Sequence, residues 1–200
     1  MAFISNGNTI LDAGAFQASL GSMVLLSEQT ASASASISFT SGIDSTYPIY
    51  KFQFINIHPA TDNADITFQG STNGGSSYGV TITSTVFQSF HFENGSAADV
   101  DYETGRDLAQ STSYQILNSA VGNNSDQSAS GELFIFNPSS TTFVKHFISV
   151  FETAQAQNYA MNPRVGGYGN TTSAVDAIDF KMSSGNIDSG TIKLYGIKDS

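Results

Sequence analysis

The residues of this chain with the clearest potential for chemistry are carboxylates that gather in one polar stretch. Asp99, Asp101 and Glu103 occupy alternate positions, as the first ligands of a calcium-binding loop do. The rest of that pattern is missing, because the glycine comes one position late at Gly105 and the twelfth position is Gln110 rather than a glutamate. We therefore expect a solvated acidic loop here and predict no metal site.

Catalytic side chains are equally hard to find elsewhere. The three histidines, His58, His91 and His146, are too few and too scattered to indicate a metal centre. His146 stands in a run that is apolar on both faces, which favours a hydrogen-bonded core histidine over a general base. No serine lies in the Gly-x-Ser-x-Gly pattern of a hydrolase, and the glycines at 166–169 lack the spacing and the lysine of a phosphate-binding loop. The sequence therefore predicts no catalytic residue, no cofactor and no enzyme activity.

Carbohydrate binding is the ligand class that the residue types leave open. Tyr78, Tyr159 and Tyr168 lie near Gly- and Asn-rich stretches, where their rings could stack on sugars. The chain has no Trp, however, and tyrosines in turns more commonly cover the ends of a β-sandwich. Glycoside hydrolysis would need a carboxylate pair across a cleft, which no motif in this sequence places.

The composition excludes several classes of protein. Of the 200 residues, 17 are acidic and 7 basic, giving a formal charge of −10, and there is no Cys. Without Cys there are no disulfides, no thiolate-bound metals and no thiol catalysis. So acidic a chain has no basic surface to follow phosphates, so we predict no nucleic-acid partner. The apolar runs are far shorter than the roughly 20 residues of a membrane helix, and the start does not resemble a secretory signal. We therefore expect no membrane partner and synthesis in a cytoplasm.

Alternation of apolar and polar residues predicts β-strands along most of the chain. The pattern is present in the following segments: 31–39, 50–54, 65–69, 80–86, 178–182 and 191–195. Two further runs, 132–137 and 143–151, are apolar on both faces, as strands covered on both sides are. Turn signals divide the chain into about nine strands, and no helical period is long enough for a βαβ unit. We predict an all-β, single-domain β-sandwich with a jelly-roll-like arrangement.

Residues 1–20 differ from this pattern, and the β-sandwich domain is expected to span 21–200. The N-terminal segment is either a frayed terminus with an edge strand or an arm that packs on a neighbouring subunit. Its apolar residues are the candidate partner-binding residues: Phe3, Ile4, Ile10, Leu11 and Phe16.

A polar, acidic insertion at about 94–130 interrupts the predicted strands. One short helix is expected near 106–110, with loop elsewhere. Loops of this length in a compact domain are usually functional or mobile.

Several phrases of the sequence resemble one family of proteins. The turn at 71–78 (STNGGSSY) and the ending at 189–197 (SGTIKLYGI) carry the resemblance, and three other stretches strengthen it: 54–62, 139–149 and 179–188. From about residue 47 onward, the chain resembles the small all-β virion structural proteins of tailed bacteriophages, especially marine and cyanobacterial ones. The N-terminal fifth and the acidic insertion match less well, and these parts would set the attachment point and the partner.

The resemblance implies a non-enzymatic component of a phage particle. We expect a capsid decoration (cement) protein that braces neighbouring capsid subunits, with the major capsid protein or other virion proteins as partners. Proteins repeated on a symmetric particle usually assemble about rotation axes, so we expect a homo-oligomer such as a trimer. The expected localisation is the virion, after synthesis in the host cytoplasm. The alternative is a tail, fibre or neck protein that recognises host surface carbohydrate.

Overall fold

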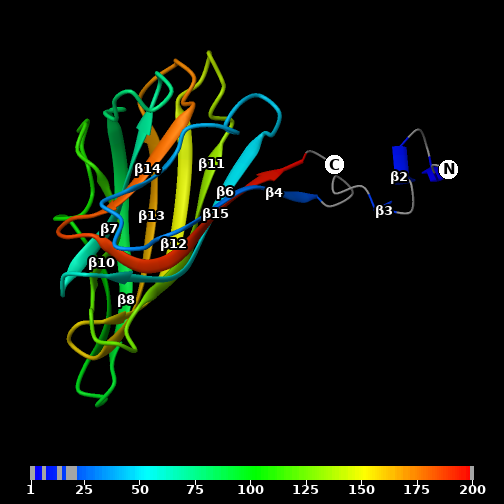
Figure 1. Cartoon of the computed structure of the whole chain (residues 1–200). Coiled ribbons are helices and arrows are strands. Elements are labelled where there is room, and N and C mark those ends of the chain that lie inside the picture. The colour runs from blue at the N-terminus through cyan, green and yellow to red at the C-terminus, as the bar shows by residue number, and fades with distance from the viewer. Residues whose placement is uncertain (1–2, 6–7, 13–14, 17–21, 199–200) are drawn as a thin grey trace.

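The structure, a computed structural model, describes residues 3–5, 8–12, 15–16 and 22–198. These residues form fifteen strands and no helix. Twelve strands belong to one long antiparallel sheet, which folds into the two layers of a β-sandwich (Figure 1). The prediction of an all-β sandwich is confirmed.

Eight of the twelve strands make a jelly roll. Their bounds are β4 (Met23–Thr30), β5 (Ile37–Phe39), β6 (Ile49–Pro59), β7 (Ala64–Ser71), β10 (Gln115–Val121), β11 (Ala129–Phe136), β14 (Ala177–Met182) and β15 (Ile187–Ile197). In one layer β4 pairs with β15, β15 with β6, and β6 with β11; in the other, β5 pairs with β14, β14 with β7, and β7 with β10. The first strand thus pairs with the last and the second with the next-to-last, as two Greek keys wrapped into a jelly roll require.

The other four strands are two insertions that widen the first layer. They are β8 (Ile82–Phe92) and β9 (Ala98–Tyr102), followed later by β12 (Lys145–Gln155) and β13 (Tyr159–Gly169). β12 pairs with β11, β13 with β12 and β8, and β9 with the outer side of β8. We call this widened sheet, from β4 to β9, the large layer, and the sheet β5-β14-β7-β10 the small layer. The two insertions explain why the twelve strands exceed the nine expected.

Aromatic side chains fill the space between the layers. The ring of Phe180 on β14 lies 5.0 Å, centroid to centroid, from the rings of both Phe52 and Phe54 on β6, and 6.2 Å from that of Phe39 on β5. All four rings are at most 2% exposed. Burial of such large apolar side chains is the main stabilising contribution to a fold of this kind.

The prediction of one strand over 31–39 is wrong for most of its length. Only Ile37–Phe39 form a strand, because Ala33 adopts a φ of 49°, which an extended strand does not allow. The backbone N–H of Ala31 donates to the carbonyl of Gly190, 2.8 Å away, so this stretch continues along β15 before the chain crosses to the small layer.

The acidic insertion contains more regular structure than its composition predicted. β9, β10 and the start of β11 lie within 94–130. The expected helix at 106–110 does not form, because Leu108 pairs with Ser84 of β8: its N–H donates to the Ser84 hydroxyl, and its carbonyl accepts from the Ser84 N–H. Arg106 contacts Glu103 at 3.7 Å and donates to Gln88 of β8. These bonds fasten the insertion to the large layer.

The N-terminal strands form a sheet of their own. β1 (Phe3–Ser5), β2 (Asn8–Asp12) and β3 (Ala15–Phe16) pair in this order, and within the described chain no strand of the sandwich pairs with them. Figure 1 shows β2 and β3 apart from the sandwich, on the side where β4 begins. We call β1–β3 the N-terminal sheet.

Candidate interaction surfaces

The outer face of the large layer carries a row of apolar side chains. Strand register aligns Leu25 of β4 with Tyr195 of β15, and Tyr195 in turn with Lys51 of β6. The row continues from Lys51 to Phe134 of β11 and then to Ile148 of β12. Residues opposite one another in neighbouring strands lie on the same face of a sheet, so these five side chains are adjacent. Leu25 and Ile148 remain 50% and 49% exposed.

A second apolar row runs beside the first. Met23 of β4 pairs with Ile197 of β15, Ile197 with Ile49 of β6, and Ile49 with Phe136 of β11. Met23 is 46% exposed. We call these two rows together the apolar band.

The charge within the apolar band is neutralised. The ammonium of Lys51 lies 2.7 Å from the carboxylate of Glu132 and 5.4 Å from the centroid of the Phe134 ring. A cation paired in this way costs less to remove from water than an isolated one. The band can therefore be covered without leaving this charge alone.

Two strands of the band explain its origin in the sequence. The runs 132–137 and 143–151 predict strands covered on both faces. In the structure, only one face of each strand is covered. Leu133 and Phe147 point between the layers and are buried, whereas Phe134 and Ile148 point outward. Monomeric proteins seldom leave broad apolar patches in water, so this face is a candidate docking surface.

The prediction that His146 is a core residue is wrong for the same reason. His146 is exposed on the outer face, with its ring centroid 6.4 Å from that of Tyr168. Its neighbour Lys145 is the buried residue, at 3% exposure, and its ammonium donates to the backbone carbonyls of Ser140, Phe143 and Thr171. Burial lowers the pKa of Lys145. This lysine ties two loops together.

The outer face of the small layer is polar, and residues 112–114 cover it. Asp179 of β14 is 3% exposed and accepts hydrogen bonds from the hydroxyls of Ser38 and Tyr114. The amide of Gln69 donates to the carbonyls of Thr112 and Ser113. Burial, and then the hydrogen bond to Asp179, raises the pKa of Tyr114. We call this surface the polar face. No local sequence motif predicts the polar face, because Tyr114 and Asp179 are 65 positions apart in the sequence.

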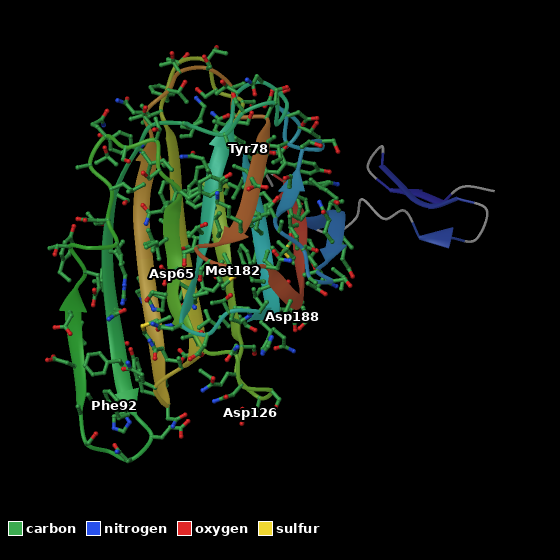
Figure 2. All side chains as sticks on the ribbon, turned by 60° about the vertical axis from the view of Figure 1, so that its left-hand side comes forward. Asp65, Tyr78, Phe92, Asp126, Met182 and Asp188 are labelled. Atoms are coloured by element: carbon green, nitrogen blue, oxygen red, sulfur yellow. The ribbon has the colours of Figure 1, made fainter. Side chains whose placement is uncertain are left out.

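The three tyrosines considered for sugar stacking do not share one groove. Tyr78 lines a hollow of about 310 Å³ together with Asn170, and its hydroxyl has no hydrogen-bond partner. Tyr159 is at the opposite end of β13 from Tyr168, with its ring centroid 4.7 Å from that of Phe92. Figure 2 shows Tyr78 and Phe92 toward opposite ends of the sandwich.

The acidic residues at 99–107 of the insertion lie on β9 and in the chain that follows it. Asp99 and Asp101 lie on the exposed strand β9, and Glu103 accepts a hydrogen bond from Gln88. Among the residues that the structure describes, no three His, Asp or Glu side chains come close enough to hold a metal ion.

The predicted partner-binding residues belong to the N-terminal sheet. Phe3 and Ile4 are in β1, Ile10 and Leu11 in β2, and Phe16 in β3. Strand register aligns Phe3 with Leu11, and Leu11 with Phe16, so three of the five occupy one row of this sheet. Their side chains lie outside the described part of the structure, and their contact with a neighbouring subunit stays a prediction.

Comparison with other proteins assigns no family: no family model, no curated protein and no solved structure matches this chain. The described residues form no helix that could cross a membrane.

Proposed function

We propose that this chain is a non-enzymatic structural protein of a tailed bacteriophage particle, and specifically a capsid decoration protein. The observation that carries the proposal is the apolar band, an open face that a structural partner would cover. The jelly roll supports it by analogy of fold alone, because viral capsid domains are among the proteins that use this architecture. The sequence phrases at 71–78 and 189–197 add their resemblance to virion proteins.

Bracing of neighbouring capsid subunits is the proposed mechanism. The first row of the band crosses five strands, which at the usual spacing span on the order of 20 Å. A surface of that width suits a stable interface of standard size, roughly 800 Å² from each partner. The net charge of −10 would limit unspecific attachment to nucleic acid while the particle assembles.

The copy number in purified virions tests this proposal. Quantitative protein analysis against the major capsid protein should find copies in proportion to the capsid subunits. Absence from the particle would overturn the proposal, and a handful of copies would replace decoration by a tail or neck position.

A second candidate is a tail or fibre protein that binds host carbohydrate, and the hollow beside Tyr78 is the observation in its favour. Its lining is mainly polar, and Tyr78 contributes to it although its hydroxyl oxygen is itself buried. Saturable binding of host surface glycans should then be lost in Tyr78→Ala and kept in Tyr102→Ala, where Tyr102 lies on β9. Equal binding by both variants would rule out this hollow.

A further inference from the structure

We infer that the apolar band is the docking site for the N-terminal sheet of a second copy of this chain. This contact goes beyond the proposed capsid role, because it joins two copies of this chain in the purified protein; a capsid subunit and the N-terminal sheet of a second copy would compete for the band.

The N-terminal sheet needs a surface to pack on. Its three strands have three, five and two residues, and so small a sheet is at best marginally stable in water without a packed apolar face. The row Phe3, Leu11 and Phe16 provides apolar residues in register across all three strands. Within the described chain, no strand of the sandwich pairs with this sheet.

The two surfaces match in chemistry. Residues 1–20 carry one charged side chain, Asp12. The charge within the apolar band is the paired Lys51. Contact between two nearly uncharged apolar surfaces removes area from water while desolvating few polar groups.

The position of the N-terminal sheet favours a second copy over the same chain. Residues 17–22 link it to Met23, which is itself part of the band, and six residues reach about 20 Å at most. In both views the sheet lies away from the strands of the sandwich, which carry the band (Figures 1 and 2). A neighbouring copy can therefore reach that band.

Strand β4 provides an edge with which a strand of the second copy's N-terminal sheet can pair. β4 pairs with β15 on one side, and on its other side Gln29 donates to the carbonyl of Ser38 near the end of the strand. Its first residues, Met23 to Ser27, include no Lys or Pro, although the register against β15 shifts at Leu26, between the pairs Leu194–Ser27 and Tyr195–Leu25. A strand of the incoming sheet can add to this edge through backbone hydrogen bonds while its apolar row covers the band.

Sedimentation velocity on the full chain tests the contact with two variants that remove opposite halves of it. Leu11→Asp alters the N-terminal sheet and keeps the band, whereas Ile148→Asp alters the band and keeps the sheet. Each should weaken self-association about tenfold or more, since an unpaired charge would be buried. Val100→Asp is the matched control: Val100 is 67% exposed on β9, outside the band, and this variant should associate like the unaltered chain.

Mixing the two defective variants gives the decisive result. The intact sheet of Ile148→Asp should dock on the intact band of Leu11→Asp, so the mixture should associate more tightly than either variant alone. A monomeric unaltered chain at all concentrations would overturn the inference. So would full association of Leu11→Asp, which would indicate direct contact between two bands, or failure of the mixture to associate.

The outcome is separable from that of the proposed function. If the N-terminal sheet docks between purified copies and this chain is absent from virions, the inference holds and the capsid role is removed. If this chain is present in virions but purified copies do not dock through the N-terminal sheet, the capsid role holds and the inference is overturned.

Discussion

The small and large layers differ in what they turn outward. On the small layer, Asp179 and Gln69 point away from the core, yet they are only 3% and 0% exposed because residues 112–114 fold over them. On the large layer, Leu25 and Ile148 also point away from the core and remain half exposed. On the outer faces of the two layers, the polar side chains are thus buried within this chain, whereas the apolar ones are left in water.

The physical requirements of the two faces explain this difference. A buried carboxylate or amide needs partners at particular distances and angles, and leaving one unpaired costs about 1–3 kcal/mol. The chain must therefore close such a face itself before it folds stably. Apolar burial is non-directional and depends on area, so a second molecule can complete it later. We therefore expect the polar face to serve folding, whereas assembly is the role that we propose for the apolar band.

The largest effect is expected where both layers meet, at Phe180. Phe180→Ala should lower the free energy of unfolding by about 3–5 kcal/mol, because the cavity faces three other aromatic rings. Urea unfolding should be compared with Phe87→Ala, a ring that is 45% exposed on β8. Equal losses in the two variants would mean that the layers do not share one core.

The next largest effect is expected on the polar face. Asp179→Ala leaves the hydroxyls of Ser38 and Tyr114 without their acceptor and should cost about 2–3 kcal/mol in the same measurement. Asp101→Ala, on exposed β9, is the control and should change stability by less than about 0.5 kcal/mol. If Asp179→Ala matched this control, the polar face would not be a folding element.

Tyr114→Phe should have a smaller effect, about 1 kcal/mol near neutral pH, because one hydrogen bond to Asp179 is lost. It should also change the alkaline limit of stability. The raised pKa keeps Tyr114 protonated in the folded state at a pH where the unfolded tyrosine, with a pKa near 10, begins to ionise. Its contribution is therefore complete below about pH 10 and is lost as the pH rises above that.

Urea unfolding between about pH 9 and pH 12 measures this difference. Stability should fall less steeply in Tyr114→Phe than in the unaltered chain. Parallel declines would show that Tyr114 is not protonated preferentially in the folded protein.

The smallest effect on folding is expected in the apolar band. Ile148→Ser should change the unfolding free energy of the monomer by no more than about 0.5 kcal/mol, since its side chain is half exposed. The buried neighbour Phe147→Ala should cost several times more, about 3 kcal/mol. A large loss in Ile148→Ser in dilute protein would mean that the band is needed for folding, and the contrast between the two faces would fail.

The strand positions of this protein were open to prediction because alternation is a local property. The spacing of two positions between Phe52 and Phe54 predicts that they share a face of a strand, and the same holds for Leu133 and Ile135. The jelly-roll class followed from the number of such runs and the turns between them. The expected helix at 106–110 and the expected strand at 31–36 are both irregular in the structure, and local alternation could not predict this. Those segments take their conformation from hydrogen bonds to Ser84 and Gly190, which are distant in sequence.

The candidate surfaces divide in the same manner. The sequence alone predicted a strand with apolar residues on both faces at 143–151, of which 145–151 lie in β12, and it showed that residues 1–20 carry apolar residues with little charge. The tertiary structure alone decided that Phe147 faces the core and Ile148 faces outward, and that Asp179 meets Tyr114. Periodicity specifies which residues share a face, but the choice of the face that is buried belongs to the neighbouring layer, which is assembled from strands far apart along the chain.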